Sequence, residues 1–252
     1  NKAKSASKTG NVLVEKKMNF EHSLIAHYTA QEGEVIFCGL TDKESKKINK
    51  DSAPVMSIQF MPSKLTEDFK ANINDKIINM LEGIGIKYGP IWIEVFYDEN
   101  NFYLNEIGYR YGGSLTYYPV DYLFGINQMH LLINYLATSK PLYKNFKDIK
   151  EIKERKNHKY CILPIQLKHG TIKSIEGLED LINKEFVYAF IQSHIVNDVI
   201  EKTGTTHQVF GYIHLVADGQ EQLEEYIKYV NGSLKVLDEN CENMVDILYC
   251  RK

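Results

Sequence analysis

The spacing of apolar residues along the chain predicts strands and helices in alternation. Short runs rich in β-branched and aromatic residues, bounded by turn residues, predict strands at 12–14, 23–28, 34–40 and 55–61. Apolar residues then recur at every third or fourth position, which predicts a helix over 66–83. Thr66 precedes two acidic residues, as the N-cap of such a helix does.

Three further segments complete the first half of the chain. Residues 41–53 are polar and lysine-rich without an apolar period, which predicts a loop. Residues 120–138 carry apolar side chains at helical spacing, which predicts one helix. Residues 1–9 are typical of the end of a helix, so we expect that an upstream part is missing.

Short strands and short helices alternate after about residue 160. The sequence therefore predicts a first unit at 1–145, a charged linker at 146–158 and a small α/β unit at 159–252. In the second unit, strands are predicted at 160–166, 171–175, 187–190 and 208–216, and helices at 179–183 and 220–230.

The most informative stretch, residues 91–118, predicts two strands joined by a polar turn. Residues 91–97 are apolar except for Glu94, so we expect a strand that is buried on both faces. Glu106 stands in the second strand, and the Asp-Glu-Asn-Asn segment at 98–101 supplies the turn. A carboxylate in such surroundings is costly unless a metal or a cation pairs with it.

The length of this turn decides whether the two acids meet. With a five-residue loop at 98–102, Tyr97 faces Tyr103, and Glu94 lies directly opposite Glu106 with the Cβ atoms roughly 5 Å apart. A four-residue loop offsets the pair by one position. Two carboxylates this close repel each other unless a cation bridges them or one is protonated.

The two acids are therefore candidate ligands of a hard cation. Oxygen ligands suit Mg²⁺, which takes one or two carboxylates and completes its shell with phosphate oxygens. The alternative is that each acid is solvated or paired with a lysine. Arg110 follows Glu106 by four residues and stands before a Gly112-Gly113-Ser114 loop, where it either stabilises phosphate charge or pairs with Glu106.

Composition and charge exclude several classes of partner. The chain has 252 residues, of which 30 are basic and 33 acidic, and the formal net charge of -3 gives no reason to expect nucleic acid or a membrane. No run of about 18 apolar residues occurs, and the first residues lack the apolar core of a secretory signal. The four cysteines stand singly, which disfavours a zinc site and favours reduced thiols in a cytoplasmic protein.

The histidines and tyrosines add no clear candidates for functional residues. The eight histidines show no H-x-x-x-H or similar spacing, so each is expected at the surface or satisfied in the core. Four tyrosines near Arg110 either line a substrate pocket or pack against their neighbours: Tyr109, Tyr111, Tyr117 and Tyr118.

A second cluster, with the sequence VEKKM at 14–18, follows the first predicted strand. Glu15 at a strand end, beside free backbone groups, could read the edge of a purine, and Glu21 could accept hydrogen bonds from ribose hydroxyls. Alone, such a segment is common at strand ends. Its value lies in the order that follows: a helix, and then a hairpin with two acids and an arginine.

This order resembles the ATP-grasp superfamily. In that family a hinge segment of the type V-E-x-x-h contacts the adenine of ATP, and a later glutamate holds the ribose. The resemblance implies that Glu15, Lys16 and Met18 contact adenine and that Glu21 contacts ribose. It covers residues 1–140 most clearly, and residues 160–252 resemble more weakly the small domain appended to biotin-carboxylase-like, carbamoyl-phosphate-synthase-like and amino-acid-ligase-like members.

The hairpin carries most of the resemblance, through a pattern like E-x-h…h-E-x-N-x-R-x-x-G. It implies that Glu94 and Glu106 are the Mg²⁺ ligands, that Arg110 is the catalytic residue that stabilises acyl-phosphate oxygens, and that Gly113 lies against the nucleotide. One departure is Gly108, where many members have an asparagine that ligates metal. The other is that the two lysines and the glycine-rich phosphate loop that precede the hinge are not in these 252 residues.

The fold class implied is α+β: the C-terminal lobe of an ATP-grasp domain, an antiparallel sheet with flanking helices, followed by the small α/β domain and lacking the N-terminal grasp elements. The implied activity is ATP-dependent ligation of a carboxylate to an amine, or to a thiol or other nitrogen nucleophile, through an acyl phosphate. ATP with Mg²⁺ (or Mn²⁺) is the implied cofactor, small carboxylates and amines are the partners, and a homodimer is compatible. We expect this part alone to be inactive.

Two other classes stay open. The first is a non-catalytic nucleotide-binding or regulatory module that keeps the fold with a degenerate site, which Gly108 favours. The second is a plain structural α/β protein, which requires that Glu94 and Glu106 do not meet.

Overall fold

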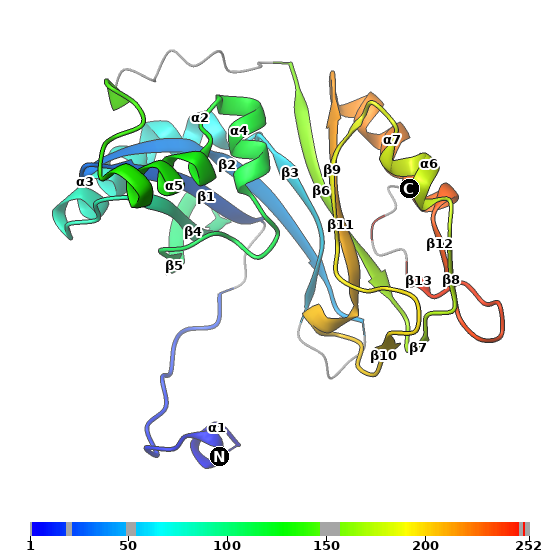
Figure 1. The fold of residues 1–252 in the computed structure, drawn as a ribbon. Coiled ribbons are helices and arrows are strands. Elements are labelled where there is room, and N and C mark those ends of the chain that lie inside the picture. Colours follow the sequence, from blue (N-terminus) through cyan, green and yellow to red (C-terminus); the bar gives the residue numbers. More distant parts are fainter. Residues whose placement is uncertain (1, 19–21, 49–53, 147–156, 247–248, 250–252) are drawn as a thin grey trace.

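The computed structural model describes residues 2–18, 22–48, 54–146, 157–246 and 249, and Figure 1 shows its fold. Within these residues one large sheet dominates. Its strands are β1 (His22–Gln31), β2 (Glu34–Lys46), β3 (Val55–Met61), β4 (Gly89–Asp98), β5 (Asn101–Gly108), β6 (Lys159–Leu167), β9 (Val187–Gln192), β11 (Val209–Ala217) and β13 (Val245–Asp246).

All neighbouring strands of this sheet are antiparallel. In the part of the chain that is described, their order is β5-β4-β1-β2-β3-β6-β11-β9, with β13 paired to β6. Two short pairs lie apart from it, β7 (Gly170–Thr171) with β10 (Val199–Ile200), and β8 (Ser174–Glu176) with β12 (Lys235–Leu237).

Helices cover both faces of the first five strands. One face is covered by α2 (Thr66–Phe69), the π-helical turn η1 (Lys70–Asn74) and α3 (Asp75–Gly83), whose Phe69 and Leu81 pack with Leu24 and Tyr28 of β1. The other face carries α4 (Tyr117–Phe124) and α5 (Gln128–Thr138). The apolar period of residues 66–83 produces this packing, because it places one stripe of side chains against the sheet.

Strand β6 joins the two halves of the chain. Its Tyr160 and Ile162 belong to the core under α4, whereas Cys161 and Leu163 belong to the core under α7 (Gln220–Ser233). Since successive side chains of a strand point to opposite faces, β6 is buried on both sides. The sheet therefore continues from the first predicted unit into the second, and the boundaries at 145 and 159 stay a prediction. The predicted linker lies largely outside the described residues.

The expected antiparallel sheet with flanking helices is confirmed, and so are the strand at 55–61 and the helical segment at 66–83. Thr66 begins that segment, but no side chain caps its N-terminus; the Ser63 hydroxyl instead accepts the backbone N–H of Leu65. The other short elements predicted after residue 160 have counterparts as well, with α6 (Leu178–Ile182) at 179–183, but the strand predicted at 171–175 is divided into β7 and β8, which belong to different sheets.

Three predicted elements are wrong. Residues 12–14 are irregular instead of a strand; Leu13 and Val14 are 84% and 85% exposed, because no described strand lies beside them. Figure 1 shows this segment, with the short helix α1 (Lys2–Ala6), leading away from the sheet. The loop predicted at 41–53 is partly strand, since β2 continues to Lys46 by pairing with β1 and β3.

The single helix predicted at 120–138 is two helices. Gly125 ends α4 in the left-handed conformation with φ 67°, which suits a residue without Cβ. The side chain of Asn127 then caps α5 by accepting the backbone N–H of His130. No helix in the described ranges is long and apolar enough to cross a membrane.

Candidate functional site

The β4–β5 hairpin brings the two predicted metal ligands together. Glu94 and Glu106 are directly paired across the two strands, so their side chains leave the same face of the sheet. The connecting loop has two residues, Glu99 and Asn100, both with positive φ (47° and 63°), as a tight hairpin of this kind requires.

The five-residue loop predicted for this hairpin is therefore wrong, although the pairing it implied is right. Tyr97 pairs with Phe102 and not with Tyr103. The register then shifts between Glu94 and Val95, because Asn105 has no partner on β4 and bulges from the strand. This extra residue restores the opposition of the two acids.

Two side chains hold the Glu94 carboxylate in place. Lys43 Nζ lies 2.5 Å from Glu94 Oε1, and Asn105 Nδ2 donates to Oε2 at 2.6 Å. The Glu94 side chain is 17% exposed, so this ion pair is partly shielded from water. The lysine pairing that the sequence left open thus exists for Glu94, whereas Glu106 is exposed.

The donor set fits a hard cation in part. Two carboxylates on one face suit Mg²⁺, which commonly keeps water or phosphate oxygens for its remaining positions. Among the described residues, no group of three or more His, Cys, Asp or Glu side chains comes together. A metal at this hairpin would therefore depend on Glu94, Glu106 and ligands from its substrate.

Steric contact with a neighbouring side chain explains why position 108 is a glycine. It pairs directly with Trp92, and a Cβ built on it would lie 2.1 Å from Cε2 of the indole. No side chain, asparagine included, fits at this position while the indole stays where it is. The departure from the family pattern is thus coupled to the tryptophan on the neighbouring strand.

Arg110 lies over the same indole, with Cζ 5.1 Å from the ring centroid. Its Nη1 also donates to the carbonyl oxygen of Tyr111 at 3.0 Å. In the described part of the chain no ion pair joins Arg110 to Glu106, so the pairing left open by the sequence is not found.

The loop after Arg110 is anchored at both ends. The Ser114 hydroxyl donates to Gln59 Oε1 of β3 at 3.0 Å, and the Tyr111 hydroxyl donates to the carbonyl of Gln128 in α5 at 2.9 Å. A Cβ added at Gly113 would meet open space, so this part of the loop leaves room for a ligand. The anchors place the loop across the sheet face that carries Glu94.

The tyrosines of this region pack against one another and their neighbours. Tyr111 meets Tyr117 edge-on at 5.4 Å, and Tyr117 stacks on Tyr118 at 4.6 Å. The Tyr109 hydroxyl donates to the carbonyl of Tyr88. For these residues the packing interpretation is the one that the contacts support.

A cavity of about 870 Å³ adjoins Glu94. Residues of β1 to β4 line one part of it, and Lys159 of β6 and Gln220 of α7 line another. Its charged side chains are three lysines and three acids: Lys43, Lys64, Lys159, Asp42, Glu44 and Glu94. Sequence analysis missed the lysines, because they come from segments that are distant along the chain and only the strand order gathers them.

The predicted hinge residues lie apart from the hairpin. Glu15 and Lys16 are exposed in the irregular segment that leads away from the sheet, and Met18 is half-buried near its end. Glu21, the predicted ribose contact, lies outside the described residues. Their roles toward adenine and ribose stay predictions.

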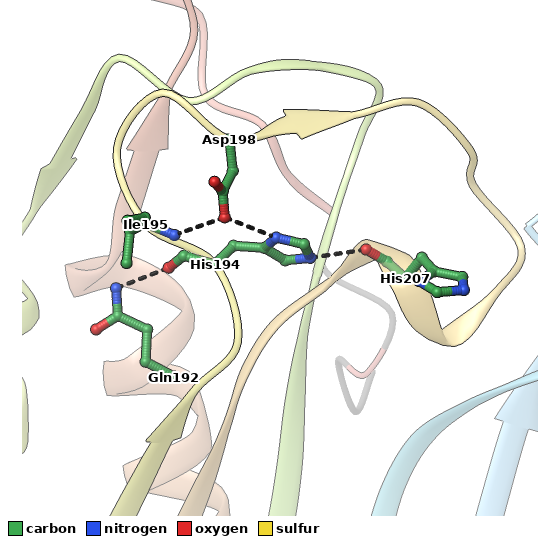
Figure 2. Close-up of polar contacts among 5 residues, drawn as sticks. All are labelled: Gln192, His194, Ile195, Asp198 and His207. Atoms are coloured by element: carbon green, nitrogen blue, oxygen red, sulfur yellow. Dashed lines mark hydrogen bonds and ion pairs between the residues drawn. The ribbon is translucent and has the colours of Figure 1, made fainter.

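A separate polar cluster at the other edge of the sheet involves a histidine (Figure 2). His194 Nδ1 lies 3.1 Å from Asp198 Oδ2, and its Nε2 lies 2.8 Å from the carbonyl oxygen of His207. Both partners are acceptor oxygens, so each ring nitrogen of His194 lies within hydrogen-bond distance of an acceptor. The Ile195 amide and His194 hold the pKa of the Asp198 carboxyl below its usual range. The cluster fastens the segment between β9 and β11 and leaves no ring nitrogen free for catalysis.

Two other histidines are buried in the core. His27 is hydrogen-bonded there as expected, whereas His214 is satisfied only in part, because its Nε2 is buried without a hydrogen-bond partner among the described residues. His27 Nε2 lies 2.8 Å from the Thr41 hydroxyl, and His214 Nδ1 lies 2.9 Å from the Tyr160 hydroxyl. Burial lowers the pKa of His27 to about 4 and that of His214 to about 3. Both rings are therefore neutral near pH 7.

No family model and no curated protein match the chain by sequence. Solved structures do match by fold. The L-amino acid ligase from Bacillus licheniformis superposes with a TM-score of 0.72 at 22% identity, over 87% of this chain and 54% of that one. Phosphoribosylglycinamide synthetase from Anaerococcus prevotii gives 0.71 at 15% identity, over 86% and 53%.

A third match is the β-γ-ATP complex of biotin carboxylase from Campylobacter jejuni, with a TM-score of 0.67 at 16% identity, over 87% of this chain and 47% of that one. The chain thus spans about half the length of the solved structures it matches. At the level of fold, the resemblance predicted from the hairpin and the hinge segment is confirmed: the chain has the fold of the ATP-grasp ligases.

Proposed function

We propose that the chain is the Mg·ATP-binding part of an ATP-dependent ligase that joins a carboxylate to an amine or a similar nucleophile. The observation that carries this proposal is the direct opposition of Glu94 and Glu106 beside a cavity whose lining includes three lysines and three acids. The shared fold with an L-amino acid ligase and with phosphoribosylglycinamide synthetase supports it.

In this proposal Glu94 and Glu106 hold Mg²⁺, which when bound neutralises charge on the phosphate oxygens. Lys43, Lys64 and Lys159 would contact the phosphate chain in the cavity, with the Mg²⁺ ion offsetting charge of the acids in the lining. Gly113 lets the backbone approach the ligand closely, because no side chain fills that space.

The proposed reaction has two steps. An oxygen of the substrate carboxylate attacks the γ-phosphorus of ATP, the bond to the β–γ bridging oxygen breaks, and ADP leaves. The nucleophile then attacks the carbonyl carbon of the acyl phosphate, and inorganic phosphate leaves with the C–O electron pair. Arg110 has a forked, permanently charged guanidinium that suits the oxygens of the transferring group.

The nucleoside contacts are part of the same proposal. Glu15, Lys16 and Met18 would contact adenine, and Glu21 would contact the ribose. Because the chain spans about half of each matched structure, we also propose that these 252 residues bind nucleotide without turning over alone.

A second candidate is a non-catalytic nucleotide-binding module. It is favoured by Trp92, whose indole leaves no room at position 108 for the asparagine of the family pattern. Within the described ranges, no group of three or more His, Cys, Asp or Glu side chains that could hold a metal is found. The two candidates agree on binding and differ on turnover.

Calorimetric titration with Mg·ATP, followed by phosphate release from the full-length protein with a panel of amino acids, separates these functions. The ligase predicts binding and amino-acid-dependent phosphate release that Arg110→Ala abolishes. Binding without release by the full-length protein would favour the non-catalytic module. Absence of binding would overturn both candidates.

A further inference from the structure

Trp92 and Gly108 form a matched pair at the end of the β4–β5 hairpin. They are directly opposite in the register, and the indole covers the glycine so closely that Cε2, Cζ2 and Nε1 would all lie within 2.4 Å of a Cβ. Real Cβ atoms essentially never lie within 3.0 Å of a non-bonded heavy atom. The φ angle of Gly108 does not lie in the left-handed region, so the indole, and not the backbone, requires glycine here.

The indole is held by packing and not by its polar atom. Its Nε1 is buried and has no hydrogen-bond partner among the described residues. The ring therefore offers a flat apolar face with a negative π-cloud. A cation placed on this face is attracted to it.

Arg110 is that cation. Its guanidinium lies over the indole, and the bond from Nη1 to the Tyr111 carbonyl fixes its orientation at a second point. An arginine side chain has several rotatable bonds, and an exposed one samples many directions. The contact with the indole and the hydrogen bond to the Tyr111 carbonyl together restrict the Arg110 side chain to one direction.

The stack of Arg110 on Trp92 lies on the same face of the hairpin as Glu94 and Glu106. Trp92 precedes Glu94 by two residues and Gly108 follows Glu106 by two, so all four belong to the same face of the hairpin. Successive positions on one face of a strand are roughly 7 Å apart. The guanidinium thus lies beyond the acids, on the same side of the sheet.

We propose that Trp92 is a positioning residue that holds Arg110 beside the carboxylate pair, and that Gly108 is present to make room for its ring. This inference rests on the proposed function for the role of Arg110 in the reaction. The stack itself is independent of that role and can be tested without substrate.

Trp92 is the only tryptophan in the chain, so its fluorescence reports on the stack directly. We expect Arg110→Met to change the emission intensity and maximum, because the cation leaves the ring face. Lys184→Met is the matched control, since Lys184 lies 5.6 Å over Tyr229 instead. Unchanged emission in Arg110→Met would overturn the stack.

The glycine is tested in the same way. We expect Gly108→Ala to displace the indole and shift its emission to the red, whereas Gly232→Ala, where a Cβ meets open space, should leave it unchanged. Identical spectra for Gly108→Ala and the wild type would contradict the steric role of Trp92.

Turnover of the full-length protein tests the positioning role. We expect Trp92→Leu to lower kcat about tenfold, with KM for ATP within about twofold, because a displaced Arg110 stabilises the transition state less. Trp92→Phe keeps an aromatic face and should retain most of kcat. Equal losses in both variants, at equal thermal stability, would overturn the proposal.

The outcomes separate this inference from the proposed function. Absence of Mg·ATP binding would overturn the proposed function, while the fluorescence of Arg110→Met would still decide whether the stack exists. Normal turnover in Trp92→Leu would overturn the positioning role and leave the ligase proposal intact.

Discussion

Lys43 of β2 reaches across β1 to Glu94 of β4, where its Nζ lies 2.5 Å from Oε1. The carboxylate proposed to hold Mg²⁺ therefore has a counterion of its own. A metal cation that binds Glu94 must share or displace this ammonium group. The same lysine lines the cavity beside the acids, where it is available to a phosphate once it leaves the carboxylate.

This ion pair predicts an unusual effect of a charge deletion. Lys43→Met should strengthen Mn²⁺ binding in the absence of nucleotide by about 3- to 10-fold, because a competing cation worth roughly 1 kcal/mol is removed. Mn²⁺ titration followed by electron paramagnetic resonance measures this affinity. Lys70→Met removes the partner of the exposed Glu67 and is the matched control. Equal or weaker binding in Lys43→Met would show that the lysine does not compete with the metal.

The anchor between Ser114 and Gln59 predicts a local change in dynamics. Ser114→Ala removes a partly buried hydrogen bond worth about 1 kcal/mol, so amides at 111–116 should exchange roughly fivefold faster. Hydrogen–deuterium exchange with mass spectrometry checks this. Ser233→Ala, which loses a bond to the Tyr229 carbonyl on α7, should not affect these amides. Unchanged exchange at 111–116 would mean that the anchor does not hold the loop.

Two buried histidines predict that the free energy of unfolding decreases at acidic pH. The pKa of His27 is lowered to about 4 and that of His214 to about 3, so both stay neutral in the folded protein while the unfolded chain protonates near pH 6.5. Below that pH the unfolded state binds more protons, so the free energy of unfolding falls as pH decreases toward 4. Between pH 7 and 5 the loss is about 2 kcal/mol for each histidine.

Urea unfolding at pH 7 and pH 5 measures this loss. His27→Gln should lose less stability than the wild type over the same interval, because its side chain does not titrate. His130→Gln changes an exposed histidine and should behave like the wild type. The same loss in His27→Gln as in the wild type would exclude His27 as a cause.

The hairpin shows what local sequence can and cannot predict. The turn chemistry and the two acids were evident from the sequence, but four turn residues in a row did not reveal that only Glu99 and Asn100 form the loop. The bulge at Asn105 has no sequence signal, because it depends on how the strands twist together. The predicted loop was too long, and the bulge compensated for the difference, so the pairing of the acids came out right.

Outside the hairpin, the sequence-based predictions failed for other reasons. The break between α4 and α5 could have been predicted, since Gly125 and the cap residue Asn127 are the usual signals for the end of one helix and the start of the next. The meeting of Lys43 with Glu94 was not, because those residues are 51 positions apart and only the order β4-β1-β2 joins them. The exposed residues 12–14 have strand-like composition without a described neighbour to pair with.

The most direct test of the metal–nucleotide site is the Mg·ATP affinity of the full-length protein measured by calorimetric titration. Glu94→Gln and Glu106→Gln should each weaken binding by about tenfold or more, because each replaces a charged oxygen ligand by a neutral amide. Glu99→Gln, in the turn of the same hairpin, should bind as the wild type does. Unchanged affinity in both Glu94→Gln and Glu106→Gln would contradict the account.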